Sequence, residues 1–218
     1  MNAAKALKTA AAAAAMAVAG AVFAVDTGLE ITCIAFHEEG GTAIYAQKYD
    51  AGGSTLWGDN GTLVCAGGGF KFSPRAAGTG DGGAFVAWED WGGVSPVIGC
   101  ARLDPDGEVA WTRKCSGGPC AGDSIITAAG GPDGFIVAWR TGGKRGGIVL
   151  QKMGFSGEKK WGDDGLHLGS GMVNSGPSVS VYSDGAVAVA WSSADASTAD
   201  GSSADVFCAK VLFDGRIP

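Results

Sequence analysis

Three short apolar runs, each opened by an Asp-Gly turn and closed by a tryptophan, dominate the hydrophobic pattern of the chain. They span residues 81–88, 133–139 and 184–191, and each is rich in Val, Ile, Ala or Phe without polar interruption. Asp-Gly suits a tight hairpin because glycine tolerates positive φ. Apolar runs of five to six residues beside glycine are too short for core helices and predict strands covered on both faces.

A second pattern, with more alternation between apolar and polar positions, recurs between these runs. Each copy is a strand-like segment that leads through a glycine-bearing turn to a tryptophan, and a further copy begins at residue 205; the complete copies are 44–50 with Trp57, 97–104 with Trp111 and 148–152 with Trp161. A glycine stands four residues before every tryptophan position, at Gly53, Gly107, Gly157 and Gly215. The turns are therefore in register along with the strands.

Six of the seven tryptophans fall into two evenly spaced series. In one series Phe36 holds the first place and the steps are 52, 51 and 52 residues, through Trp88, Trp139 and Trp191. In the other the steps are 54 and 50 residues, through Trp57, Trp111 and Trp161, so only Trp91 lies outside both. Four short strands in roughly 51 residues are typical of a propeller blade. The sequence predicts an all-β, β-propeller-like array of four-stranded antiparallel blades; a β-solenoid or a pair of sandwiches is the rival architecture.

The number of units bears on how the array closes. We expect about 14 strands, or about 3.5–4 blades, whereas ring propellers usually have four to eight. The chain is therefore expected to be part of a longer propeller. A four-bladed ring, or an arc that closes by self-association, is the alternative, because an open arc leaves unpaired strand edges.

The segments 44–61, 81–90 and 150–165 resemble a repeat of secreted bacterial proteins. In that repeat an Ile-Tyr-Ala-Gln-Arg strand precedes a Leu-Trp-Gly turn, and an Asp-Gly-Gly turn leads into an Ala-Trp strand. The resemblance covers most of residues 28–218 and implies a β-propeller in a secreted or surface protein, without implying an activity. The chain departs from the pattern at Thr112, where the other copies have glycine after the tryptophan.

The first 24 residues stand apart from the repeat. Lys5 and Lys8 precede an uncharged apolar run over 10–24, which ends in Val-Phe-Ala, and this is typical of a secretory signal peptide. An uncleaved anchor is the alternative, although the run is short for a membrane span. We therefore expect a signal peptide at 1–24, a repeat domain at 25–218 without a transmembrane segment, and a secreted, periplasmic or cell-surface location.

Charge and cysteine content narrow the partners and the covalent chemistry. The chain has a formal net charge of −6, which argues against nucleic acid and anionic membranes as partners. All six cysteines follow the leader, where export permits disulfides. The Cys115–Cys120 pair is the expected disulfide, because the Ser-Gly-Gly-Pro between these residues forms a turn.

Signals for catalysis are sparse. No nucleophile elbow is present, and we expect neither a cofactor nor a metal ion. The glycine-rich segment 78–83 leads into a strand and is expected to be a turn rather than a phosphate loop. The Asp-rich segments 59–61, 104–108 and 163–165 recur at one place in the repeat and are likewise expected to be turns rather than calcium loops.

These observations favour a non-enzymatic, exported scaffold, adhesion or ligand-binding module, whose partner is a protein or a glycan. The alternative is a polysaccharide-degrading hydrolase or lyase on the same scaffold. For an enzyme, the candidate acid and base are Glu38, Glu89 and Asp90, and two of these carboxyl groups would have to lie within about 5–10 Å of each other.

Overall fold

The structure is a computed structural model, and it describes residues 18–23, 30–38, 41–116, 125–129, 133–141, 146–169, 176–194 and 204–218. For 18–23, 30–38 and 125–129 the backbone alone is described. These residues form 15 strands and no helix. Within the part of the chain that is described, no helix is long and apolar enough to cross a membrane.

The strands form four antiparallel sheets that follow one another in chain order. Sheet 1 has the order β1-β2-β3-β4, with strands Val18–Phe23, Glu30–Glu38, Gly41–Tyr49 and Thr62–Cys65. Sheet 2 has the order β5-β6-β7-β8, with strands Lys71–Gly78, Ala84–Asp90, Val97–Leu103 and Val109–Lys114. Sheet 3 contains Ile125–Ala129 (β9), Gly134–Arg140 (β10), Ile148–Gly154 (β11) and Leu166–Leu168 (β12). Sheet 4 contains Ser178–Val181 (β13), Val187–Ala194 (β14) and Ala204–Val211 (β15).

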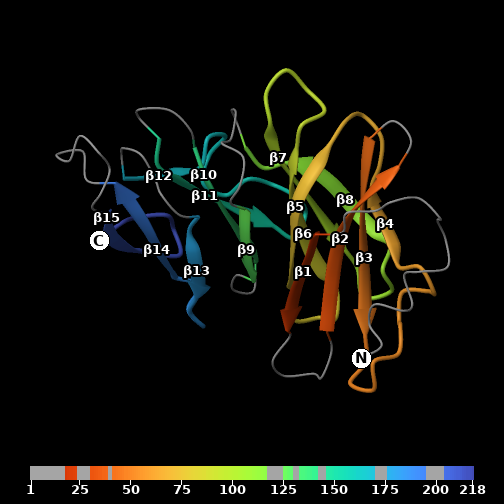
Figure 1. The fold of residues 1–218 in the computed structure, drawn as a ribbon. Coiled ribbons are helices and arrows are strands. Elements are labelled where there is room, and N and C mark those ends of the chain that lie inside the picture. The colour runs from red at the N-terminus through yellow and green to blue at the C-terminus, as the bar shows by residue number, and fades with distance from the viewer. Residues whose placement is uncertain are drawn as a thin grey trace.

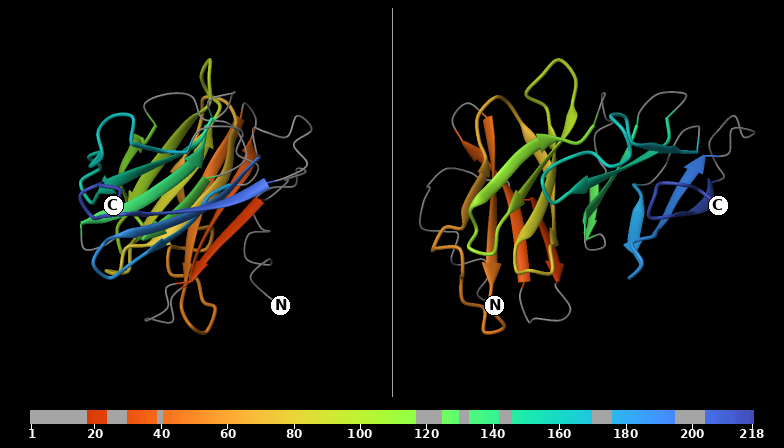
Figure 2. Two further views of the ribbon diagram at one scale, coloured as in Figure 1. Left: turned by 90° about the vertical axis from the view of Figure 1, so that its left-hand side faces the viewer. Right: turned by 180° about the vertical axis from the view of Figure 1, so that it is seen from behind.

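The first strand of each sheet lies on the side where the sheets converge. β1 contacts β5, β5 contacts β9, and β9 contacts β13. Figures 1 and 2 show the sheets side by side, with sheets 1 and 4 at opposite ends of the array. This arrangement is that of β-propeller blades, so the predicted fold class is confirmed.

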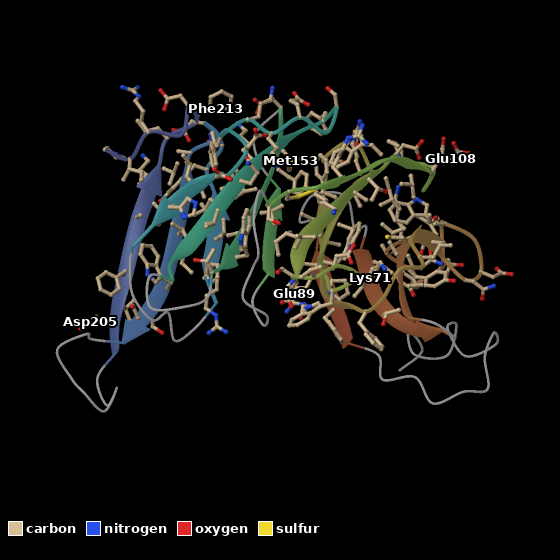
Figure 3. All side chains as sticks on the ribbon, turned by 90° about the horizontal axis from the view of Figure 1, so that it is seen from above. Lys71, Glu89, Glu108, Met153, Asp205 and Phe213 are labelled. Carbon is tan, nitrogen blue, oxygen red and sulfur yellow. A yellow bond between two sulfur atoms is a disulfide. The ribbon has the colours of Figure 1, made fainter. Side chains whose placement is uncertain are left out.

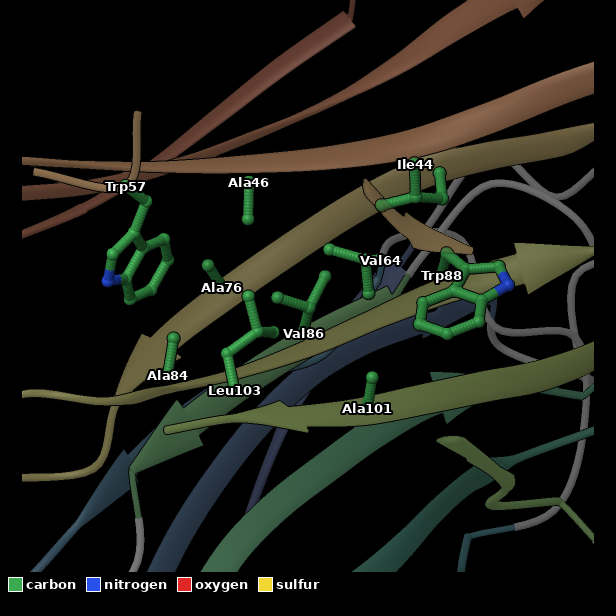
Figure 4. Packing of buried hydrophobic residues seen from close by; sticks show 10 residues of the cluster. All are labelled: Ile44, Ala46, Trp57, Val64, Ala76, Ala84, Val86, Trp88, Ala101 and Leu103. Atoms are coloured by element: carbon green, nitrogen blue, oxygen red, sulfur yellow. The ribbon is translucent and has the colours of Figure 1, made fainter. Parts of the chain in front are cut away.

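Successive residues of a central strand pack against different neighbouring sheets, which explains the uninterrupted apolar runs. In β6, Val86 and Trp88 pack in a cluster with residues of sheet 1, whereas Phe85 and Ala87 pack with residues of sheet 3. Figure 4 shows the first of these clusters, which also includes Trp57. Between sheets 2 and 3, the rings of Phe85 and Phe135 stack with centroids 3.9 Å apart.

The two tryptophan series face in opposite directions along the array. Trp88, Trp139 and Trp191 are each buried against the preceding sheet. Trp57 and Trp161 are buried against the following sheet, and the half-buried Trp111 packs the same way. Each interface between blades therefore receives one indole from either side. Phe36 lies on β2, and its side chain is outside the described part of the chain.

A buried glutamine explains the Gln and Trp-Gly elements of the repeat. The side-chain oxygen of Gln151 accepts hydrogen bonds from the backbone N–H groups of Lys152 and Trp161, at 3.0 and 3.1 Å, and its nitrogen donates to the Gly162 carbonyl at 2.7 Å. Gln47 makes the same three contacts with Lys48, Trp57 and Gly58. Gly58 and Gly162 both have positive φ, which suits glycine at these turns.

Sheet 2 lacks this arrangement because Ala101 holds the glutamine position. There β8 runs as a strand through the tryptophan, pairing Trp111 with Arg102 and Thr112 with Ala101. The departure at Thr112 therefore marks a blade in which an ordinary strand ladder replaces the glutamine-held turn.

The disulfide lies elsewhere than the sequence predicts. The prediction of a Cys115–Cys120 bond was wrong, because Cys115 is bonded to Cys100. These two cysteines lie diagonally across the β7–β8 pair with Cα atoms 6.3 Å apart, a separation that a disulfide can span. Cys120 lies outside the described residues.

The first strand falls inside the expected signal peptide. β1 supplies the first strand of sheet 1 by pairing with β2, from Val18 opposite Ala35 to Phe23 opposite Glu30. The segment assigned to export from its sequence thus also has a place in the sheet.

Candidate functional site

The strands of each sheet end on two opposite sides of the array, which we call its edges, and the two edges carry different connections. The β5–β6 and β7–β8 turns lie at one edge, and the β4–β5 and β6–β7 connections, residues 66–70 and 91–96, lie at the other. Figure 3 shows Lys71, Glu89 and Asp205 at the second edge and Glu108, Met153 and Phe213 at the first. We call the second edge the pocket edge.

A pocket of about 420 Å³ opens at the pocket edge between sheets 1 and 2. Its charged lining comes from the start of β5, the end of β6 and the end of β8. The lining residues are Cys65, Ala66, Gly67, Gly68, Lys71, Asp90, Gly92, Gly93, Ser95, Val97 and Lys114.

Glycines allow three chain segments to meet beside this pocket. Gly69, with φ of +98°, forms a bridge with Gly41 at the start of β3, and its carbonyl accepts a 3.1 Å hydrogen bond from Thr42 N–H. A Cβ atom at Gly69 would lie 2.7 Å from Gly92 Cα, and one at Gly41 would lie 2.6 Å from the Gly69 oxygen. The wall of the pocket therefore depends on backbones that approach too closely for side chains.

Opposite charges line the pocket at the ends of paired strands. Lys71 and Asp90 are register partners in the β5–β6 ladder. Lys71 is only 2% exposed, and its ammonium donates a hydrogen bond to the Gly67 carbonyl. Burial raises the pKa of the neighbouring Cys65 thiol, an effect that the charge of Lys71 opposes and that of Asp90 adds to. A lysine this deeply buried needs polar partners, and the loop carbonyl is one of them.

Of the three candidate carboxylates, Glu89 and Asp90 have described side chains, and these two do not lie together. Glu89 and Asp90 are consecutive on β6, so their side chains point to opposite faces of sheet 2. Asp90 faces the pocket, where it also accepts a 2.9 Å hydrogen bond from Gly92 N–H. Glu89 is 2% exposed on the face toward sheet 3 and accepts a 3.2 Å hydrogen bond from the Trp91 indole. Of these two, only Asp90 is placed to meet a ligand in the pocket.

Glu38 ends β2, and the backbone there lies beside the pocket. It is the register partner of Gly41, whose backbone contacts the pocket loop at Gly69. Glu38 also follows Phe36 by two residues, as Asp90 follows Trp88, so the two acidic residues hold matched places in neighbouring blades. Its side chain is outside the described part of the chain.

A β-bulge shapes the start of β5. The β5–β6 register shifts between Phe72 and Arg75, which leaves one extra residue in β5. Ser73 within this bulge has φ of +51°, in the left-handed region that non-glycine residues rarely occupy. Bulges and such backbone strain gather at functional sites, where they redirect side chains. Here the bulge follows directly after Lys71 and Phe72.

The remaining polar candidates belong to turns or lie apart. The carboxylate of Asp104 accepts hydrogen bonds from Asp106 N–H at 3.1 Å and Glu108 N–H at 2.9 Å, so it serves the β7–β8 turn as expected. Asp81 likewise binds Gly83 N–H at 3.0 Å and the Thr79 hydroxyl. Among the residues whose side chains are described, no three His, Cys, Asp or Glu gather where they could hold a metal ion.

The pocket and the roles of Lys71 and Trp91 beside the acidic pair were not predicted from the sequence. Lys71 occurs in no recognisable motif, and its burial depends on loops that meet only in the folded chain. One signal was available for Trp91, since it was the only tryptophan outside both structural series.

No protein-family model matches the chain, and no curated protein sequence matches it. Among solved structures, the chain is similar to one from the GH130 family of mannoside phosphorylases, described as containing glycoside hydrolases that target β-1,2 mannosidic linkages in Candida mannan. The identity is 12%, the TM-score is 0.51, and the match covers 92% of this chain and 68% of that one. It is also similar to a provisionally assigned glycoside hydrolase from Bacteroides ovatus, with 11% identity and a TM-score of 0.50, over 92% of this chain and 70% of that one.

At this level of identity the likeness shows the fold alone. It nevertheless corrects the functional expectation drawn from the sequence. The expected non-enzymatic scaffold, adhesion or ligand-binding module is contradicted, because the similar structures are described as glycoside hydrolases.

Proposed function

We propose that the chain forms the substrate-binding face of a glycoside hydrolase, with the reaction centre at the pocket edge between sheets 1 and 2. One observation carries the proposal: the Asp90 side chain lines a pocket of about 420 Å³ together with the buried Lys71. A concave site with a few convergent polar groups is the usual form of a small-ligand site. The likeness of the fold to glycoside hydrolases supports a glycan as the ligand.

Hydrolysis of a glycosidic bond needs two carboxyl groups. One donates a proton to the leaving oxygen as the bond from the anomeric carbon breaks, and the other activates water or attacks that carbon. We assign one of these roles to Asp90 and the other to Glu38, which ends the matched strand of the neighbouring sheet. Lys71 and Lys114, which line the same pocket, would orient hydroxyl or carboxylate groups of the sugar.

We also propose that the protein acts outside the cytoplasm, either secreted, in the periplasm or at the cell surface. The leader-like residues 1–24 support this location, and so does the resemblance to secreted propeller repeats. A large extracellular polysaccharide is then the substrate class that fits both the pocket and the location.

The proposal is tested by incubating the purified protein with mannan, arabinan, xylan and arabinoxylan and measuring released reducing ends. We expect hydrolysis of at least one polymer, and Asp90→Asn should lower kcat by about 100-fold or more, the usual contribution of an acid or base. Glu38→Gln should have a similar effect. Asp106→Asn, which changes an exposed carboxylate at the opposite edge, is the matched control and should retain full activity.

Glu89→Gln tests whether the neighbouring carboxylates Glu89 and Asp90 contribute differently to activity. Because the Glu89 side chain is buried against sheet 3 and holds the Trp91 indole, we expect a smaller loss of activity than for Asp90→Asn. Absence of hydrolysis of all four polymers by the wild-type protein, or full activity of Asp90→Asn, would overturn the proposal.

A further inference from the structure

Three exposed aromatic side chains meet at the pocket edge of sheet 2. Phe70, Phe72 and Trp91 are 52%, 37% and 43% exposed. The rings of Phe70 and Phe72 are nearly parallel with centroids 6.1 Å apart, and the ring of Phe72 meets that of Trp91 edge to face, also at 6.1 Å. We call these three residues the aromatic platform. Exposed apolar patches of this kind mark binding surfaces.

Hydrogen bonds within the loop backbone and to a buried carboxylate hold the platform in place. Trp91 N–H donates a 2.8 Å hydrogen bond to the Phe70 carbonyl, which ties the two connections together. The Trp91 indole N–H is fixed at 3.2 Å from the carboxylate of Glu89, which is the register partner of Phe72. The bulge at Ser73 then ends the regular ladder directly after Phe72. The rings are therefore pre-oriented before a ligand arrives, which lowers the entropic cost of binding.

The platform and the pocket share the same strand ends. Phe72 is the register partner of Glu89, whose side chain points to the face of sheet 2 opposite Asp90, and the Trp91 indole is hydrogen-bonded to Glu89. The rings therefore lie across the strand ends from the polar pocket and do not line it. A sugar chain offers the matching chemistry, because a sugar ring has an apolar C–H face and a rim of hydroxyl groups. An anionic membrane surface fits poorly, because the chain carries a net charge of −6.

We propose that the aromatic platform binds the face of a sugar residue in a glycan chain that crosses the strand ends of sheet 2 to reach the pocket. This inference rests on the proposed function, which places the reacting part of the glycan in the pocket. Binding of the glycan to the platform can be measured without hydrolysis. Glu89 is a positioning residue in this site, since it acts by holding Trp91. The platform supplies affinity for the polymer, and the pocket holds the bond that reacts.

Affinity electrophoresis tests the platform directly. Native gels containing mannan, arabinan, xylan or arabinoxylan should retard the wild-type protein in at least one case. Trp91→Ala should raise the dissociation constant about tenfold or more, the usual effect of removing a central aromatic contact. Trp91→Phe, which keeps an aromatic face and loses the indole N–H, should bind within about threefold of wild type if stacking dominates. Tyr182→Ala removes an aromatic side chain that is 52% exposed at the opposite edge and should bind as wild type does.

The outcomes separate this inference from the proposed function. Retardation that is lost in Trp91→Ala, without hydrolysis of any polymer, would support the platform and refute the enzyme. Hydrolysis by the wild-type protein with equal retardation of Trp91→Ala would refute the platform and leave the enzyme standing. A wild-type protein that no polysaccharide retards would overturn the platform. Circular dichroism of each variant must match that of wild type, so that loss of binding is not loss of fold.

Discussion

The indole of Trp57 donates a 3.0 Å hydrogen bond to the Pro105 carbonyl, which belongs to the β7–β8 turn of the following sheet. Trp111 makes the equivalent bond to the Phe155 carbonyl in sheet 3, at 2.7 Å. In both cases the ring lies against the glycine two residues further along, Gly107 or Gly157. The glycine and tryptophan series thus form one contact that joins each blade to the next.

Gly107→Ala should destabilise the protein more than an ordinary glycine substitution. Its φ is +88°, and a Cβ atom would lie 2.5 Å from Cγ of Trp57. Left-handed backbone costs an alanine about 1–2 kcal/mol, and overpacking adds roughly 1–3 kcal/mol. We expect urea unfolding to report a total loss of about 2–5 kcal/mol in the free energy of unfolding.

Gly53→Ala is the matched control for this contact. Gly53 holds the same turn position in sheet 1 with φ of +82°, but a Cβ atom there would have nothing within 4 Å. Gly53→Ala should therefore lower the free energy of unfolding only by the cost of a left-handed alanine, about 1–2 kcal/mol. Equal losses for the two variants would show that the contact with Trp57 contributes nothing to stability.

The architecture could be predicted because its determinants are local and repeated. Asp-Gly turns, apolar runs and in-register glycines each indicate strands or hairpins without knowledge of distant contacts, and the period then assembles them into blades. The apolar run and the alternating segment that follows it form neighbouring strands in sheets 2 and 3, as β6–β7 and β10–β11. The departure at Thr112 was visible as well, although its reason, the alanine at position 101, needed the β7–β8 register.

Asp90 and Glu38 were candidates from the sequence, but the pocket could not be predicted because its lining comes from segments that the repeat does not relate. The pocket needs Cys65, Lys71, Asp90 and Lys114 at one edge, and its wall needs backbone contacts among Gly41, Gly69 and Gly92. The opposite directions of Glu89 and Asp90 follow from strand alternation once the β6 boundary is known. The disulfide prediction failed because sequence proximity was given more weight than the diagonal pairing of Cys100 and Cys115.

Gln151→Leu should destabilise sheet 3 strongly. Gln151 is fully buried and satisfies three backbone groups, those of Lys152, Trp161 and Gly162. A leucine would leave all three without this partner, and each unsatisfied buried group costs about 1–3 kcal/mol. Thermal unfolding should show a clearly lower Tm, and Gln47→Leu should behave alike in sheet 1. A Tm within one or two degrees of wild type, against the shift of several degrees that such a loss implies, would contradict the role given to this side chain.

The Cys100–Cys115 disulfide predicts a specific pattern of cysteine reactivity. Under non-reducing conditions, peptide mass mapping should recover these two cysteines in one cross-linked species, and Cys120→Ser should leave that species intact. The double variant Cys100→Ser/Cys115→Ser should lose about 3 kcal/mol of stability, as expected for a loop of this length. Recovery of a Cys115–Cys120 peptide instead would restore the sequence-based assignment.

The leader and the first strand make opposite predictions for the N-terminus. Cleavage after Ala24 would remove β1, and β2 would then be the innermost strand of sheet 1. We expect the protein recovered from the periplasm or medium of an expressing bacterium to begin at Val25, as judged by intact mass. Retention of residues 1–24 in the exported protein would instead assign that segment to the fold.

Asp81 should make stability depend on pH in the acid range. Partial burial would raise the pKa of Asp81, but hydrogen bonds from Thr79 and Gly83 and the charge of Arg102, 3.1 Å away, together hold it below its ordinary value. A depressed carboxyl pKa contributes stability that is complete above the unfolded value, about 3.9, and that is lost as the pH falls through the folded value. The Tm difference between wild type and Asp81→Asn should therefore be larger at pH 7 than at pH 3. A constant difference across this range would mean that the ionised form of Asp81 does not stabilise the fold.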